Sequence, residues 1–460
     1  MEQRKYGLFT AISMIVGIVI GSGIFFKSYN ILALTGGNVS QGVLALCLAA
    51  ISIVFGCLAI SELASRTDSA GGVITYSENF WSKKLAIVFG WFHMWIYYPT
   101  LIAIIAWIAG IYINNLFGWK NTLELQVLIS LVVILFLYAM NMISAKLGGG
   151  FQRTSVVLKM IPLVLLAIAG LIWGDPVTTW TAHATKETSG TWLKAIPAVL
   201  FSFDGWIVAT TICHEIKESK KNLYLALVFS PLIVLVLYIM YFVGMSAYMG
   251  PDQIIAMGAS EHLAAAATKL VGSQIGAKLI MILVIISVLG TDNGLILSNI
   301  RLPYSLAIRK MMPSSDKYTT VDKVHGVPMR SGYFSLFVAL FWVVMHYITQ
   351  KFIWKDGLHD ISEIAMVVNY ILIIFLYLAV IKLAIKGEVK GVVRGWIIPI
   401  LAIVGALIIV NSGFQNELFG IFLVICLVVV GIAYLFAVKH PEIDKVDLKS
   451  FESTEFGKDV

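Results

Sequence analysis

The stretch VIGSGIFF, residues 19–26, lies inside a long apolar segment and weakens it as a helix. From Leu8 to Phe26 the chain carries no charged residue, and such a segment is long enough to cross a bilayer. Gly21 and Gly23 lie within this segment, although glycine costs about 1 kcal/mol relative to alanine inside a helix. The sequence therefore places a weak point inside its first predicted membrane span.

The composition of the whole chain is typical of a polytopic membrane protein. Of its 460 residues 59% are hydrophobic and 13% are charged, and the mean hydropathy is +0.88. Soluble domains are about 45–50% apolar and about 25% charged. Apolar runs of about 20 residues recur along the chain, whereas the alternating segments of about ten residues that mark a β-barrel do not. We therefore expect an all-α polytopic membrane protein.

These apolar runs predict twelve transmembrane helices. The predicted spans are residues 8–35, 41–62, 85–113, 124–144, 152–173, 192–214, 223–248, 278–308, 332–349, 362–386, 393–411 and 417–438. The alanine-rich segment 252–270 is predicted to be an external helix. We expect no cleavable signal peptide, because no small-residue cleavage site precedes Gly21 and the apolar run continues past it.

The distribution of basic residues predicts the orientation of the chain in the cell membrane. If the N-terminus is cytoplasmic, 24 of the 33 lysines and arginines fall in inner segments and eight, including Lys27, in outer ones. Cytoplasmic segments are enriched in lysine and arginine, so both termini are predicted to be cytoplasmic. The net charge of +7 then reports topology rather than a nucleic-acid partner.

The polar residues argue against an enzyme. An enzyme needs a cluster of His, Asp, Glu or Cys side chains at one site, and the eight His and four Cys of this chain are scattered. The spacing of these residues predicts no metal site, no cofactor and no catalytic residue. A channel would need a filter loop or a ring of pore-lining groups, and the sequence suggests neither. The sequence therefore argues against both classes.

A second interruption in the sequence indicates a transporter. The predicted sixth span contains AVLFSFDGWIVATT, residues 198–211, with Asp204 and Gly205 near its centre, five spans after Gly21. Paired interruptions in two halves point to the binding site of a transporter. The division that follows is a first five-helix repeat over 1–175, a second, inverted repeat over 191–388, two accessory helices over 392–438 and a cytoplasmic tail over 439–460.

A broken helix exposes main-chain groups, which must line a cavity rather than face lipid. The N–H groups that begin a half-helix at Gly23 suit a carboxylate, and carbonyl groups near Val19 and Phe201 suit an ammonium. Together they match a zwitterionic amino acid. The alternative is a small-residue packing face, which the four-residue spacing of Gly17 and Gly21 also fits.

Six motifs in this order resemble one transporter superfamily. They are GIVIGSGIFF (17–26), SELASRTDSAGGVITYSE (61–78), FGW (89–91), FSFDGW (201–206), HEIKESKKNLYLAL (214–227) and LGTDNGLILSNIRLPYSLAIRKMMP (289–313). The chain resembles the amino acid–polyamine–organocation superfamily, and more narrowly the bacterial relatives of the L-type amino acid transporters. It departs from the family pattern at Ile74, a common tyrosine, and at KESKKN, which replaces the usual Asn-Pro.

The resemblance implies a LeuT-like fold with discontinuous helices 1 and 6, a five-plus-five inverted repeat and alternating access. It implies that the substrate carboxylate binds the main chain at Ser22, Gly23 and Ile24. The substrate ammonium would meet carbonyl groups at Val19, Phe201, Ser202 and Asp204. Phe201 would also close over the substrate from outside. Further candidates for the site are Gly21, Trp206 and Asn369.

Lys159 stands inside the predicted fifth span, where a lysine costs roughly 3 kcal/mol. The alternative without a functional role is that the long side chain extends so that its ammonium reaches the inner membrane interface. The resemblance implies instead that this lysine replaces the sodium ion of coupled relatives and donates to groups near Gly17 and Ser287. If burial lowers its pKa, Lys159 could carry a coupling proton.

Other polar residues in the spans predict local contacts. The Asp204 side chain is expected to cap the half-helix that follows it rather than to contact substrate. Asp292 and Asn293 are expected to form an internal hydrogen-bonding pair with spans 1 or 5. Glu62 is expected to pair with Arg66, four residues on.

We therefore predict a sodium-independent secondary transporter of small neutral L-amino acids of the alanine, serine, threonine and cysteine class, acting as an exchanger. The alternatives are a proton-coupled permease that uses Lys159 and a carrier of larger neutral amino acids. The expected partners are the amino acid and the lipid bilayer, with no nucleic acid and no obligate partner chain.

Overall fold

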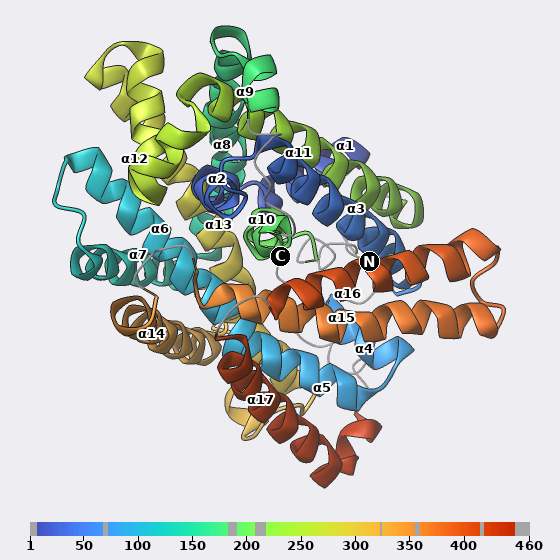
Figure 1. The fold of residues 1–460 in the computed structure, drawn as a ribbon. Helices are drawn as coiled ribbons and strands as arrows, with labels where there is room; N and C mark the ends of the chain where they lie inside the picture. Colours follow the sequence, from blue (N-terminus) through green and yellow to red (C-terminus); the bar gives the residue numbers. More distant parts are fainter. Residues whose placement is uncertain are drawn as a thin grey trace.

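The computed structural model describes residues 7–67, 72–182, 191–207, 218–322, 324–354, 359–414 and 418–446. These residues form a bundle of helices, in which the one extended pairing is an isolated bridge between Asp322 and Val327 (Figure 1). Ten helices among the described residues are long and apolar enough to cross a membrane. The prediction of an all-α polytopic membrane protein is confirmed.

The helices follow the predicted spans closely. The first half of the chain forms α1 (Leu8–Val19), α2 (Gly23–Leu34), α3 (Val39–Ala64), α4 (Val73–Phe80), α5 (Lys83–Phe92), the π-helical segment η1 (His93–Tyr97), α6 (Tyr98–Phe117), α7 (Leu123–Ile143), α8 (Ala145–Trp173) and α9 (Pro176–Ala182). The second half forms η2 (Thr191–Ala195), α10 (Ile196–Phe203), α11 (Ser219–Met249), α12 (Pro251–Val271), α13 (Gln274–Ile308), η4 (Ser315–Lys317), α14 (Met329–Phe352), α15 (Ser362–Ile385), η5 (Val393–Ile397), α16 (Ile398–Gly413), α17 (Phe419–Lys439) and η6 (Pro441–Lys445).

Two of the predicted spans are absent from the ten long helices, and they are the two with interruptions. In the first, α1 ends at Val19, the backbone turns to an extended conformation at Ile20, and α2 begins at Gly23. In the sixth, α10 ends at Phe203 and Asp204 is extended, with ψ of 160°. The expected second half of that span, together with much of the HEIKESK motif, falls on residues 208–217, outside the described residues.

The two interrupted helices lie together near the middle of the bundle. Figure 1 shows α2 and α10 close to its centre, and the two helices pack against each other. Helix α8 packs against α11 and α13, and α1 contacts all three. These elements surround the point where α1 and α10 stop, so the fold brings both weak points of the sequence to one place.

Two peripheral helices show how the bundle meets its surroundings. Helix α17 is strongly apolar, yet only 22% of its most apolar window is buried, as expected where lipid is the solvent. Helix α12 is not among the ten candidate spans, and its backbone bends at Gly258, where φ is 76°. It packs against α2 and α13, and its external position stays a prediction.

Candidate functional site

The two interruptions approach each other so closely that glycine is required. A Cβ atom added at Gly23 would overlap the main chain of Ser202, at the end of α10. A Cβ atom added at Gly21 would overlap the side chain of Thr291, in α13. Glycine permits such backbone contacts because it has no side chain. The glycines of the first interruption therefore seat it against α10 on one side and α13 on the other.

The hydroxyl group of Tyr238 bridges the two interrupted helices. It belongs to α11 and donates a hydrogen bond to the carbonyl oxygen of Ser202 at 2.6 Å, while the carbonyl oxygen of Val19 lies 3.3 Å away. These two carbonyl groups are ones that the resemblance assigns to the substrate ammonium. Sequence reasoning missed Tyr238, because a tyrosine in an apolar run carries no signal that separates it from a packing residue.

Lys159 is buried and its ammonium reaches the first interruption. Its Nζ lies 2.6 Å from the carbonyl oxygen of Gly17, 2.7 Å from that of Ile20 and 3.2 Å from the hydroxyl oxygen of Thr291. An ammonium has three donors, so these acceptors can use all of them. The side chain does not snorkel to the interface in this structure. It compensates the carbonyl end of α1, where the helix dipole is negative.

Near Ser287, the hydroxyl group that Lys159 contacts is that of a threonine rather than a serine. The Ser287 hydroxyl is buried and has no hydrogen-bond partner among the described residues. Thr291, one helical turn further along α13, provides the hydroxyl oxygen instead. The sequence could not distinguish the two, because positions four residues apart lie on the same face of a helix.

The main chain predicted to hold the substrate carboxylate begins α2. Ser22 precedes the helix, Gly23 and Ile24 open it, and the first N–H groups of a helix have no partner within it. The side chain of Ser22 is 1% exposed, and its hydroxyl has no hydrogen-bond partner among the described residues. This end of α2 thus offers main-chain donors and one unused hydroxyl.

The carboxylate of Asp204 is held from the third predicted span. Tyr97, in η1, places its hydroxyl 2.6 Å and 2.8 Å from the two carboxylate oxygens. The imidazole of His93 stacks on the Tyr97 ring with centroids 4.7 Å apart and lies 2.9 Å from the side-chain oxygen of Asn369. The half-helix that Asp204 is expected to cap falls on residues 208–217, outside the described residues. A π-helical turn, frequent at functional sites, therefore connects α10 with α15 here.

Phe201 in α10 and Trp206 just after it contact different neighbours. Trp206 is 1% exposed and donates its indole N–H to the hydroxyl of Tyr370 at 3.4 Å. Phe201 is also buried, and the ammonium of Lys27 lies 5.1 Å from the centroid of its ring. Both side chains therefore contact polar groups of neighbouring helices rather than apolar ones alone.

Lys27, which the sequence assigned to an outer segment, is buried inside a helix. It lies in α2, is fully buried, and forms ion pairs with Asp360 at 2.7 Å and Glu363 at 3.0 Å. Burial alone would raise the pKa of the Asp360 carboxyl group. The Lys27 ammonium and its hydrogen bond, together with Ser362, hold that pKa below its ordinary value. These residues tie α2 to the start of α15.

The paired role expected for Asp292 and Asn293 holds for Asn293 only. Asn293 accepts a hydrogen bond from Asn141 at 2.7 Å and donates to Gly148 and to Gln152, each at 3.1 Å. Asp292 is 1% exposed, and neither carboxyl oxygen has a hydrogen-bond partner among the described residues. The expectation for Glu62 is confirmed, since Arg66 lies 2.8 Å from its carboxylate.

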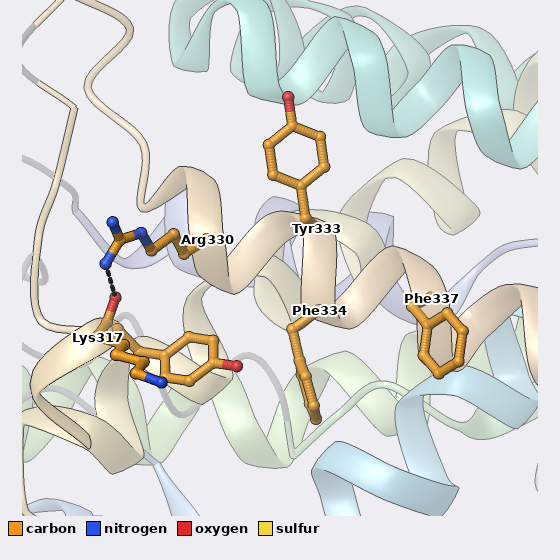
Figure 2. A pocket seen from close by; sticks show the side chains of 6 residues that line it. Lys317, Arg330, Tyr333, Phe334 and Phe337 are labelled. Atoms are coloured by element: carbon orange, nitrogen blue, oxygen red, sulfur yellow. Dashed lines mark hydrogen bonds between the residues drawn. The ribbon is translucent and has the colours of Figure 1, made fainter. Parts of the chain in front are cut away.

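A hollow at the surface lies apart from these residues. It is lined by Lys317, Tyr318 and side chains at the start of α14, and Figure 2 shows Tyr333 and Phe334 pointing away from each other. Arg330 donates to the carbonyl oxygen of Lys317 at 3.2 Å. Tyr333 and Phe337 are 61% and 68% exposed, so the hollow faces the surroundings of the bundle and is not a candidate substrate site.

Comparisons with known proteins show the family of the chain. A family model described as amino acid permease matches residues 6–433. The chain is 30% identical over 416 residues to the serine/threonine exchanger SteT of Bacillus subtilis, which covers 89% of this chain and 91% of that protein. It is 27% identical over 259 residues to the b(0,+)-type amino acid transporter 1 of Mus musculus, 55% of this chain and 53% of that one. It is 25% identical over 263 residues to the human cystine/glutamate transporter, 56% of this chain and 52% of that one.

Proposed function

The chain belongs to the amino acid permease family, and we propose that it exchanges small neutral L-amino acids across a membrane without sodium. One observation carries the proposal: the two interrupted helices meet, and the main-chain groups at their ends are adjacent. A similar chain, SteT, is named for the exchange of serine and threonine. Both the geometry and this relative favour a small zwitterion as the substrate.

The proposed site grips the two charged ends of an amino acid. The carboxylate would accept hydrogen bonds from the N–H groups at Ser22, Gly23 and Ile24, where the positive end of the α2 dipole adds to the attraction. The ammonium would donate to the carbonyl groups of Val19 and Ser202, which the Tyr238 hydroxyl now bridges. The carbonyl groups of Phe201 and Asp204 complete this end.

The side chains near the second interruption favour a neutral substrate. The Asp204 carboxylate would repel an acidic side chain, because like charges at short range are unfavourable where water is scarce. Tyr97 donates to that carboxylate, which satisfies part of its capacity to bind a cationic side chain. We propose that the buried rings of Phe201 and Trp206 limit the size of the substrate side chain.

Lys159 supports the absence of a sodium requirement. Its ammonium bonds to two carbonyl groups at the end of α1 and to a hydroxyl of α13, and carbonyl and hydroxyl oxygens are also typical ligands of hard metal cations. A fixed positive charge in this position removes the need for a bound cation to hold the interrupted helix against α13.

We further propose the topology that accompanies this function. The ten long helices and the two interrupted segments would make twelve spans in the cell membrane, with two inverted five-helix repeats over 1–175 and 191–388, accessory helices over 392–438 and a cytoplasmic tail over 439–460. Both termini would be cytoplasmic. Alternating access would follow from movement of the interrupted helices.

Uptake of radiolabelled serine into proteoliposomes tests the proposal. Vesicles loaded with unlabelled serine should accumulate label many times faster than empty ones, and replacing sodium by choline should change nothing. Unlabelled alanine and threonine should compete, whereas leucine, arginine and glutamate should compete poorly.

Each part of this experiment has an outcome that would contradict the proposal. Equal uptake by loaded and empty vesicles would overturn exchange, and a sodium requirement would overturn the role given to Lys159. Strong competition by leucine would favour the carrier of larger neutral amino acids.

A further inference from the structure

Asp292 is a buried acid that the transport site described above leaves unused. It lies in α13, its side chain is 1% exposed, and both carboxyl oxygens lack a hydrogen-bond partner among the described residues. Burying an unpaired carboxylate is strongly unfavourable. Acids inside membrane spans therefore pair with another group or take part in proton and ion pathways.

The residues on either side of Asp292 are firmly held. Thr291 contacts the Lys159 ammonium at 3.2 Å, and Asn293 bonds to α7 and α8 through Asn141, Gly148 and Gln152. The turn of α13 that carries Asp292 is thus fixed against the first interruption and against two further helices. Of these three consecutive polar side chains, that of Asp292 alone forms no hydrogen bond within the part of the chain that the structure describes.

Among the residues that the structure describes, the helices packed on α13 provide no counter-ion for this carboxyl group. Helices α1 and α6 contain no Asp, Glu, His, Lys or Arg. From α7, Tyr138 interacts electrostatically with Asp292, and its hydroxyl accepts a hydrogen bond from Asn299. From α8, the ammonium of Lys159 is already bonded to three acceptors.

The other titratable groups on these helices are exposed or contact other residues. Lys146 and Arg153 of α8, Glu124 of α7, Lys84 of α5, Asp252 and Glu261 of α12, and Asp316 and Lys317 of η4 are exposed. The others have partners away from Asp292: His93 of η1 with Asn369, His262 of α12 with Phe25, Lys269 of α12 with Tyr248, Lys83 of α5 with Ile443, Arg330 of α14 with Lys317, Lys351 of α14 with Glu124, and His346 of α14 with the Trp107 ring.

We infer that Asp292 is a proton-binding site of this carrier. A proton from water binds one carboxyl oxygen, which converts the carboxylate to a neutral acid and removes the uncompensated charge. A proton fits this site better than a metal ion does, because the described residues contain no group of three or more His, Cys, Asp or Glu side chains that could hold a metal ion. The proton leaves again when the contact of α13 with the first interruption opens during transport.

Infrared spectroscopy of the purified protein tests the bound proton without relying on transport. The C=O stretching band of a protonated carboxyl group should be present in the wild type, should decrease on alkaline titration, and should be missing from Asp292→Asn. Asp316→Asn, at an exposed carboxylate, should keep the band. An ionised Asp292, shown by identical spectra of the wild type and Asp292→Asn in this region, overturns the proposal.

The pH dependence of exchange tests whether the proton comes and goes. Above the midpoint, serine exchange by the wild type should fall up to about tenfold per pH unit, because one group titrates. Asp292→Asn, which mimics the neutral acid, should exchange serine with a flat profile. A persistent band together with the same pH profile in both proteins would mean a permanently protonated structural group and would overturn the exchangeable proton.

A chemical probe covers the case in which Asp292→Asn fails to fold. Dicyclohexylcarbodiimide reacts with protonated carboxyl groups in apolar surroundings, so the wild type should be modified at Asp292, and less so as the pH rises. Absence of modification there at every pH overturns the proposal. Because the proposal rests on the proposed function only for the release step, serine exchange by the wild type at one pH tests that function separately.

Discussion

The ammonium of Lys159 donates a hydrogen bond to the carbonyl oxygen of Gly17 at 2.6 Å, which joins α8 to the last turn of α1. Replacing Lys159 by methionine keeps much of the volume but removes the donor from carbonyl groups that remain buried. Hydrogen bonds to charged groups contribute about 1.5–3 kcal/mol each. We expect serine exchange in proteoliposomes to fall at least about tenfold, in line with such a loss.

Lys120→Met provides the matched control, since that lysine is exposed in a loop and its replacement should leave exchange unchanged. Normal exchange by a folded Lys159→Met protein would contradict the role given to the ammonium.

Tyr238→Phe should weaken substrate binding. The change removes the hydroxyl that bridges the carbonyl oxygens of Ser202 and Val19, so two of the proposed ammonium ligands lose their common support. A typical hydrogen bond contributes about 0.5–1.5 kcal/mol, which corresponds to an increase in KM of about two- to tenfold. The KM for serine, measured in loaded vesicles, checks this.

Tyr241→Phe is the control on the same helix. Tyr241 is also fully buried, but its hydroxyl has no hydrogen-bond partner among the described residues. Its replacement should leave the KM for serine near the wild-type value, and equal effects of the two substitutions would argue for packing alone.

The ion pairs of Lys27 with Asp360 and Glu363 should stabilise the folded protein. Lys27→Met leaves two buried carboxylates without their cation, and breaking a buried pair costs about 3–5 kcal/mol. The thermal unfolding temperature in detergent should fall clearly. Lys351→Met, which removes an exposed pair with Glu124, should change it little.

The same cluster should make the folded protein less stable in acid. Because the folded pKa of Asp360 lies below its ordinary value of 3.8, its contribution is present above that pH and is lost as the pH falls through the folded pKa. Lys27→Met should abolish this part of the acid sensitivity. Equal unfolding temperatures for the wild type and Lys27→Met at neutral pH would exclude a stabilising cluster.

His262 should make the docking of α12 sensitive to mild acid. Its ring lies 3.0 Å from the carbonyl oxygen of Phe25 in α2, and burial lowers its pKa from 6.5. The unfolded chain therefore binds a proton more readily, so stability falls as the pH drops below about 6.5 toward the folded pKa.

Thermal unfolding of the wild type and His262→Gln between neutral and mildly acidic pH checks this. Glutamine cannot titrate, so the difference between the two proteins should shrink as the pH falls. A difference that stays constant across the range would show that the protonation of His262 does not affect stability.

The sequence by itself determined the membrane class, most of the spans and the place of both interruptions. Each long apolar run is made by consecutive residues. The weak points at Gly21 and Gly23 and at Asp204 and Gly205 are likewise made by residues close together in the sequence. Each is a property of a few neighbouring residues and of the solvent that surrounds them. Lys159 could also be singled out, because a charge within a span is rare whatever it contacts.

Only the tertiary structure decided which side chains meet at the interruptions. Tyr238 lies 36 residues from its acceptor in Ser202, and Lys27 lies 333 residues from Asp360. The choice of Thr291 over Ser287 and the isolation of Asp292 depend on how α13 is rotated against its neighbours. Helix packing sets that rotation through contacts between distant parts of the chain, and local sequence patterns do not encode such contacts.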